Sequence, residues 1–322
     1  MGEIHLTGAY GIDEILQYNR TRLDRGWNFP SFFRFWEACP GAELVKVGQK
    51  TPSPEATLLV ANLNQATWES IGELMSSYGR TILLQMEAYQ GWEIAYQECA
   101  RFSFFLSFDP TYAWHPGYIH FDIPYEKSQA SSHRDRRGFP GMKKQWRYSK
   151  RDFLSVYLLP FLPRKKKAVM IATLHPQERY QNRLHMAERW AEVVDVYGGG
   201  WPKSLLSYRG LAASKIDIMK RYRYCLVFEN QRQPGYVTEK LLDCFVAGSV
   251  PLYWGAPGEL ENGAEAALIR IDDQHVPIGS LMQDQAGYQR RRSALITSRD
   301  QMLDRYSIAR FTGALRQALQ GV

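Results

Sequence analysis

Tyr236, Glu239 and Lys240 combine a ring, a carboxylate and a cation at positions i, i+3 and i+4. If Tyr236 lies just before the first turn of a helix, this spacing brings the three side chains to one side of it. A cation suits a diphosphate, a carboxylate accepts hydrogen bonds from ribose hydroxyls, and a ring packs against a base or sugar. The trio therefore fits a nucleotide sugar. The alternative interpretation is that Glu239 and Lys240 are ordinary surface charges.

The elements around the trio follow a strand, loop, helix and strand pattern. An apolar strand at 225–228 is followed by a turn at Pro234-Gly235, a helix from about Thr238 that Gly248 ends, and a strand at 250–254. The carboxyl end of a strand and the amino end of a helix therefore meet there. In open α/β sheets this edge binds ligands, because helix amides point outward toward an anion.

This block resembles the α1,3-fucosyltransferases of glycosyltransferase family 10. The similar residues are Phe228-Glu229-Asn230, the Tyr-Val-Thr-Glu-Lys run at 236–240 and the Gly-Ser-Val-Pro-Leu-Tyr-Trp-Gly run at 248–255. A further stretch at 193–200, Val-Val-Asp-Val-Tyr-Gly-Gly-Gly, is similar to the family's Val-Asp-Val-Phe-Gly segment. The resemblance extends over roughly 168–255 and is of the bacterial type. It implies GDP-fucose as the donor and a glycan containing N-acetylglucosamine as the acceptor.

The resemblance implies a role for each donor-site residue. Arg183 and Lys240 would stabilise the departing diphosphate, Glu239 would hold the ribose, and Asn230 and Tyr236 would help to hold the nucleotide or sugar. No metal site is expected, because the chain has no Asp-x-Asp signature and side chains with a helix end would neutralise the phosphates. A divalent metal would at most stimulate. The alternative for Arg183 is a salt bridge to a nearby glutamate.

Glu87 ends the apolar stretch 81–87, where the family has a catalytic glutamate. The resemblance implies that Glu87 takes the proton of the acceptor hydroxyl, which gives direct displacement with inversion. The alternative is a charge at a strand end, with Glu93 or Glu98 as the base.

Two series of strands and helices predict an α/β fold of GT-B type, with two Rossmann-like domains facing each other across a cleft. The expected boundaries are 1–160 for the acceptor domain and 161–303 for the donor domain. A helix in 304–322 is expected to pack back on the first domain. A polar loop at 127–151 would lead to the connection near 160–163.

Composition and charge limit the classes of function. With 45% hydrophobic and 23% charged residues, the 322-residue chain is expected to be globular, and its net charge of +7 suits an anionic partner. No RNA-binding or zinc-finger signature accompanies the basic clusters at 134–137, 164–167 and 290–292, so nucleic acid is not expected. These clusters are interpreted as solvated loop charge or as weak attraction to an anionic membrane.

The four cysteines are widely spaced and are expected to be reduced thiols. No apolar run is long enough to span a bilayer, and a cytoplasmic location is expected. Three hypotheses remain: an inverting fucosyltransferase, a transferase of the same architecture with another nucleotide sugar, and a non-catalytic glycan-binding or anionic-surface protein.

Overall fold

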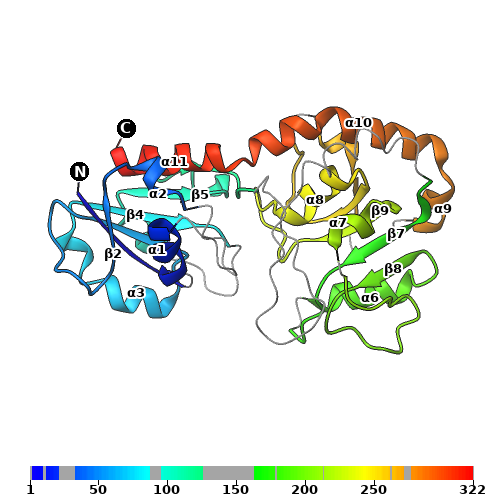
Figure 1. Cartoon of the computed structure of the whole chain (residues 1–322), viewed down its shortest axis with the longest axis horizontal. Helices are drawn as coiled ribbons and strands as arrows, with labels where there is room; N and C mark the ends of the chain where they lie inside the picture. Colours follow the sequence, from blue (N-terminus) through cyan, green and yellow to red (C-terminus); the bar gives the residue numbers. More distant parts are fainter. Residues whose placement is uncertain are drawn as a thin grey trace. The chain divides into compact units, whose positions relative to one another are not determined.

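The computed structural model describes residues 2–9, 12–21, 33–87, 96–125, 163–177, 180–212, 214–261, 263–271 and 277–321. They form two compact units (Figure 1). Unit 1 comprises Met1–Pro124, Gln233–Tyr236 and Tyr306–Val322, and unit 2 comprises Tyr125–Arg232 and Val237–Arg305. The expected loop at 127–151, nearly all of the connection at 160–163 and the domain boundary at 160/161 lie outside the described residues, so they stay predictions.

Unit 1 is built on a six-stranded sheet in which all strand pairs are parallel, with the order β2-β1-β3-β4-β5-β6. Its strands are β1 (Glu3–Gly8), β2 (Glu43–Lys46), β3 (Thr57–Ala61), β4 (Arg80–Gln85), β5 (Phe104–Ser107) and β6 (Tyr118–His120). Its helices are α1 (Ile12–Thr21), α2 (Phe35–Ala38), α3 (Gln65–Ile71), α4 (Tyr96–Cys99) and α11 (Ile308–Gln320).

The central strands of unit 1 are buried on both faces, as the continuous apolar runs of β3 and β4 require. The apolar stretches at 57–61, 81–86, 102–108 and 118–123 predict β3 to β6 within a few residues, whereas β1 and β2 were not predicted from the sequence. Helix α11 is amphipathic and belongs to this unit, where Phe311 and Leu315 join the same core cluster as Leu59 and Leu84. Figure 1 shows α11 beside α2 and β5.

Unit 2 is built on a five-stranded parallel sheet with the order β11-β10-β9-β7-β8. Its strands are β7 (Lys165–Ile171), β8 (Val194–Tyr197), β9 (Tyr222–Phe228), β10 (Val250–Trp254) and β11 (Ile269–Arg270). Its helices are α6 (Gln181–Arg189), α7 (Lys215–Met219), α8 (Glu239–Ala247), α9 (Ile278–Gln283) and α10 (Gln285–Arg305).

Helix α8 has the boundaries that its sequence predicts. Thr238 is the N-cap and accepts a hydrogen bond from the amide of Lys240, and Gly248 ends the helix in the left-handed conformation with φ of 66°. All seven residues from Leu241 to Ala247 are buried, so the helix packs into unit 2 with only its first turn left at the surface. That first turn carries Glu239 and Lys240.

The sequence analysis interpreted the basic clusters as solvated loop charge, but two of them do not lie in loops. Arg164 precedes β7 and donates to the carbonyl oxygens of Tyr222 and Ala247 and to the hydroxyl of Ser249, so its guanidinium is internal. Residues 290–292 lie inside α10. The cluster at 134–137 lies outside the described residues. Within the described ranges, no helix has both the length and the apolar character needed to cross a bilayer.

Candidate functional site

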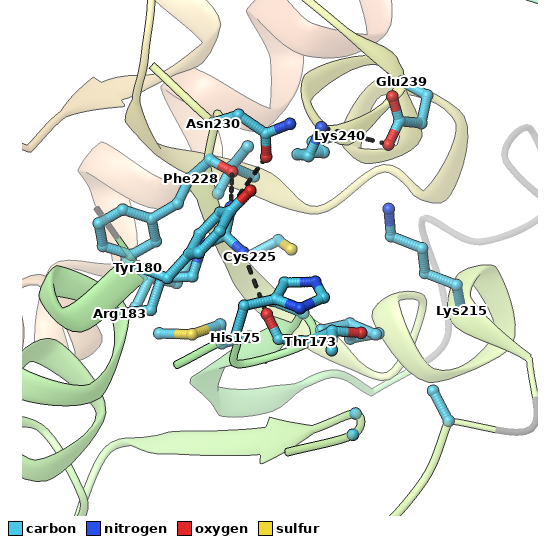
Figure 2. Close-up of a pocket in the computed structure, with 18 of the residues that line it drawn as sticks. Thr173, His175, Tyr180, Arg183, Lys215, Cys225, Phe228, Asn230, Glu239 and Lys240 are labelled. Carbon is cyan, nitrogen blue, oxygen red and sulfur yellow. Dashed lines mark hydrogen bonds and ion pairs between the residues drawn. The ribbon is translucent and has the colours of Figure 1, made fainter. Parts of the chain in front are cut away.

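A cavity of about 350 Å³ opens in unit 2 at the carboxyl ends of β7 and β9 (Figure 2). The chain runs from β7 to β8 on one side and returns to β9 on the other side of β7, so the strand order reverses between these two strands. Ligands of open α/β sheets bind at such a switch point, and this volume lies in the range of small-molecule sites. Helices α6 and α8 both begin at the cavity, because Tyr180, Arg183, Glu239 and Lys240 line it.

Arg183 is fixed to the ends of both strands. Its guanidinium donates to the carbonyl oxygen of Thr173 at 3.1 Å, to that of Phe228 at 3.4 Å and to Oδ1 of Asn230 at 3.3 Å. The guanidinium also stacks over the ring of Tyr180, 4.5 Å from its centroid, and only 5% of the residue is exposed. The structure therefore brings Arg183 and Asn230 together on one wall of the cavity and holds the guanidinium in one orientation.

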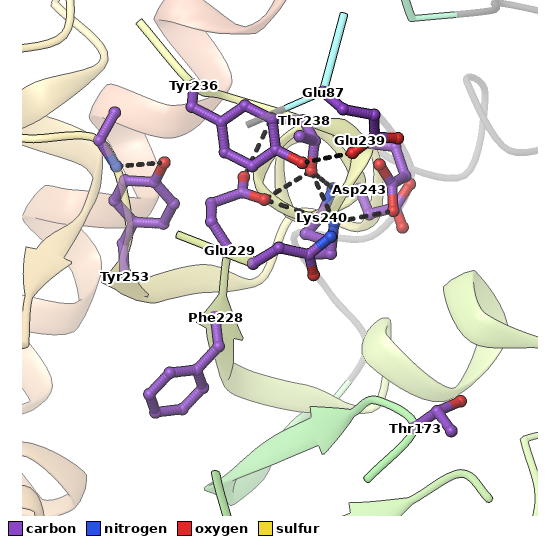
Figure 3. A network of polar contacts seen from close by, with 12 residues as sticks. Glu87, Thr173, Phe228, Glu229, Tyr236, Thr238, Glu239, Lys240, Asp243 and Tyr253 are labelled. Carbon is purple, nitrogen blue, oxygen red and sulfur yellow. Dashed lines mark hydrogen bonds and ion pairs between the residues drawn. The ribbon is translucent and has the colours of Figure 1, made fainter. Parts of the chain in front are cut away.

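Lys240 is held by a buried carboxylate and the N-cap hydroxyl (Figure 3). Its ammonium donates to the Thr238 hydroxyl at 2.9 Å and lies 3.4 Å from a carboxylate oxygen of Glu229. Glu229 follows β9 directly and accepts from the Thr238 amide at 2.9 Å and the Thr238 hydroxyl at 2.6 Å. Burial raises the pKa of the Glu229 carboxyl, and the Lys240 ammonium opposes that rise. The cation of the predicted trio is thus preorganised.

Glu239 stays ionised although it lies in a crowded site. Burial alone would raise the pKa of this carboxyl, but the ammonium groups of Lys240 and Lys215 and a hydrogen bond from Thr238 outweigh burial, so the pKa is lowered. The carboxylate lies 3.4 Å from Nζ of Lys240. An ionised carboxylate accepts hydrogen bonds only, which is what two ribose hydroxyls require.

Removing the Thr238 hydroxyl is expected to destabilise unit 2. In Thr238→Val, α8 loses its N-cap and both Glu229 and Lys240 lose a hydrogen bond, so we expect the free energy of unfolding to fall by about 1–2 kcal/mol. Chemical denaturation of the purified protein measures this change. Thr238→Ser keeps the hydroxyl and is the matched control. Equal stability of the Val and Ser variants would contradict the network.

Tyr236 and Glu87 are both in unit 1, because the middle of the β9–α8 loop, Gln233–Tyr236, belongs there. The Tyr236 ring packs against Phe108 with the centroids 5.3 Å apart, and its hydroxyl donates to Oε2 of Glu87 at 3.3 Å (Figure 3). Gln233 donates to the carboxylate of Asp109 at 2.8 Å. Tyr236 is only 2% exposed and does not line the cavity. Its hydroxyl instead contacts Glu87, the predicted base.

The turn that carries Glu87 is fixed by Asn62. The side-chain oxygen of Asn62 accepts from the amides of Met86 and Glu87 at 2.7 and 3.1 Å. Asn62 itself has a φ of 56°, a left-handed conformation that asparagine tolerates better than most residues. Glu87 therefore lies just after the carboxyl end of β4, where Asn62 holds its backbone and the Tyr236 hydroxyl contacts its carboxylate.

The glycines at 198 and 199 also line the cavity. Gly198 has a φ of 131°, and a Cβ there would lie 1.9 Å from the carbonyl oxygen of Ala172. A run of three glycines at 198–200 favours a tight turn, and the close approach of the chain after β8 to the end of β7 requires one.

Three residues of the site were not assigned roles from the sequence. Glu229 and Thr238 hold Lys240, and Lys215 lines the cavity from α7. The position of Glu229 directly after a buried strand was a usable signal. Lys215 stands in no motif, and only the packing of α7 against α8 brings it to the cavity.

Comparison with known proteins now bears on this site. Residues 162–277 match the model of glycosyltransferase family 10 (fucosyltransferase), C-terminal part. This segment is therefore similar to the C-terminal part of the family 10 glycosyltransferases. The cavity residues from Met170 to Lys240 all lie inside this matched segment.

Curated relatives match the chain over a similar length. An α-(1,3)-fucosyltransferase of Helicobacter pylori is 28% identical over 111 residues, which are 34% of this chain and 22% of the relative. Human α-(1,3)-fucosyltransferase 4 is 35% identical over 121 residues, which are 36% of this chain and 22% of the relative. The chain's matched part thus spans about a fifth of these relatives.

Solved structures resemble nearly the whole chain. A crystal structure of an α1,3-fucosyltransferase covers 99% of this chain and 90% of its own, with a TM-score of 0.61 and 16% identity. Anabaena HepE in complex with UDP-glucose has a TM-score of 0.56 at 9% identity, and each chain is covered completely. The predicted α/β fold of GT-B type is therefore confirmed.

Proposed function

We propose that the protein is an inverting fucosyltransferase that moves L-fucose from GDP-fucose to a hydroxyl of an N-acetylglucosamine-containing glycan, in α1,3 or α1,4 linkage. The observation that carries the proposal is the cavity of the segment that matches family 10, where Arg183, Asn230, Glu239 and Lys240 converge. A solved structure of similar fold, with a TM-score of 0.59, is that of an α1,3-fucosyltransferase with GDP-fucose, which also supports this donor.

We propose that the transfer is a direct displacement. The acceptor hydroxyl oxygen attacks the anomeric carbon, the bond from that carbon to the β-phosphate oxygen breaks, and Glu87 takes the hydroxyl proton. Negative charge grows on the leaving GDP, where Lys240, Arg183 and the amino ends of α6 and α8 stabilise it. Glu239 accepts from the ribose hydroxyls, and Asn230 orients Arg183. Tyr236 would hold the donor through the loop that it anchors.

Two other functions remain as competitors. HepE has a similar fold and was solved in complex with UDP-glucose, so the fold alone does not determine the nucleotide or the sugar. A non-catalytic glycan-binding protein would have no use for two cations and a carboxylate around one cavity. The residues of the cavity therefore favour a transferase.

The test is a transfer assay on the purified protein with GDP-fucose and N-acetyllactosamine. We expect release of GDP and a fucosylated product with α configuration at the new bond, equally in the presence of EDTA, because side chains and helix ends supply the positive charge. Hydrolysis without transfer, no reaction, or a product with β configuration would contradict the proposal. If EDTA abolished activity and Mn²⁺ restored it, only the proposed independence from metal would be contradicted.

We further propose a cytoplasmic protein that associates weakly with anionic membranes through Lys165–Lys167. Lys165 and Lys167 lie 3.9 and 3.8 Å from the Asp195 carboxylate, which Arg209 also binds at 2.8 Å, so part of this charge is neutralised within unit 2. Co-sedimentation with phosphatidylserine vesicles should fall when the three lysines are changed to glutamate. Unchanged co-sedimentation would remove the membrane proposal.

A further inference from the structure

A third cation, Lys215, enters the cavity from α7, and a carboxylate lies behind it. Nζ of Lys215 contacts a carboxylate oxygen of Asp243 on α8. Asp243 is 2% exposed, and its other carboxylate oxygen accepts from the Tyr125 hydroxyl at 3.1 Å. Burial raises the pKa of the Asp243 carboxyl. A buried carboxylate is costly unless paired, so Lys215 has a fixed partner that holds its ammonium in place.

The same side chain also faces the cavity. Lys215 is among the lining residues, and its side chain is 26% exposed. Figure 2 shows its ammonium directed into the open space beside Glu239, with Lys240 between Glu239 and Arg183. The polar groups of this wall therefore follow the order Arg183, Lys240, Glu239 and Lys215, and Lys215 stands at the end away from Arg183.

We propose that Lys215 is a ligand-binding residue at the nucleoside end of the cavity, where its ammonium donates to oxygens of the ribose or purine beside Glu239. The inference rests on the proposed function, since it needs a nucleoside diphosphate as the ligand. In the proposed function Arg183 and Lys240 bind the diphosphate and Glu239 binds the ribose, so a cation beyond Glu239 would meet the nucleoside.

The charges around Lys215 support this placement. Burial lowers the pKa of the Lys215 ammonium, and the Glu239 carboxylate opposes that fall while Lys240 adds to it. Lys215 in turn helps to keep Glu239 ionised. The other titratable groups near Lys215 are the Asp243 carboxyl, which its ammonium contacts, and the thiols of Cys225 and Cys244. Lys215 and Glu239 thus form a donor and acceptor pair at the same end of the cavity, which suits a ribose diol or a purine edge.

The experiment compares two ligands, GDP and inorganic pyrophosphate, by calorimetry. Lys215→Met should weaken GDP binding by about tenfold, the loss expected for one charge-assisted hydrogen bond, while pyrophosphate binding stays within about twofold of wild type. Lys240→Met should weaken both ligands. Lys220→Gln is the control at the C-cap of α7, because Lys220 pairs with Asp217 at 3.9 Å and does not line the cavity, so both ligands should bind unchanged.

A second variant separates binding from folding. Lys215→Met could be unstable because Asp243 loses the Lys215 ammonium. The double variant Lys215→Met/Asp243→Asn then removes both charges and keeps a side-chain oxygen that accepts from the Tyr125 hydroxyl. The double variant should show the same selective loss of GDP binding. Unchanged GDP binding, or an equal loss of GDP and pyrophosphate, would overturn the role of Lys215 while leaving the proposed function standing. Failure of the wild-type protein to bind GDP would overturn both.

Discussion

Glu87→Gln is expected to lower kcat for fucosyl transfer by about 1,000-fold, within the range measured for loss of a general base, while GDP-fucose still binds. The amide cannot accept the acceptor's proton, but it keeps the shape of the side chain and an oxygen for the Tyr236 hydroxyl, now 3.3 Å from Oε2 of Glu87. Because Glu87 belongs to unit 1 and the cavity to unit 2, the loss of turnover should not be accompanied by a loss of donor affinity.

The controls for Glu87 are variants of the two alternative bases, Glu93 and Glu98. Glu98→Gln, at α4 in the same unit, should leave kcat within about twofold of wild type, and Glu93→Gln likewise. Steady-state kinetics and donor titration of each variant provide the comparison. Normal turnover in Glu87→Gln, with loss of turnover in either of the other two, would transfer the role of base to that residue.

Lys240→Ala is expected to raise the barrier to transfer by about 3 kcal/mol, a little over 100-fold in kcat/KM. The ammonium is preorganised by Thr238 and Glu229 before any ligand binds, so it stabilises charge on the leaving diphosphate without a reorganisation cost. Its removal also leaves the Glu229 and Glu239 carboxylates without the cation that now lies 3.4 Å from each. Because charge on the diphosphate grows during the reaction, kcat should fall more than donor affinity.

The matched control for Lys240 is Lys203→Ala, an exposed lysine of the same unit, which should behave as wild type. Pre-steady-state and steady-state measurements separate kcat from binding. A Lys240→Ala enzyme with near-normal turnover would show that the diphosphate is stabilised elsewhere. A loss confined to donor affinity would show that Lys240 binds the ground state and the transition state equally.

Local signals in the sequence were sufficient for the β9–α8 part of the site. The apolar run of β9, the Thr238 cap and Gly248 each act over a few residues, so the strand end and the helix start could be placed from the chain alone. The spacing of Glu239 and Lys240 in the first turn of α8 followed from those boundaries. Their neighbours in space did not, since the Thr238 and Glu229 network depends on how the loop returns to the helix.

The parts that the sequence did not predict depend on packing between distant segments. Helix α10 was missed because its buried positions include the polar residues Ser298 and Arg299, which weakens the apolar repeat. Arg164 was expected to be solvated, but its guanidinium donates hydrogen bonds to the carbonyl oxygens of Tyr222 and Ala247. The spacing of Tyr236 could not predict the hydrogen bond from its hydroxyl to Glu87, 149 residues away in the chain, and its role in holding the donor stays a prediction.

The measurement that tests the account most directly is calorimetric titration of the purified protein with GDP-fucose, with UDP-N-acetylglucosamine as the control ligand. We expect saturable binding of GDP-fucose and of GDP, with no comparable binding of the control. A folded protein that binds neither GDP-fucose nor GDP would contradict it, and a protein that prefers the control ligand would place another nucleotide sugar in the cavity.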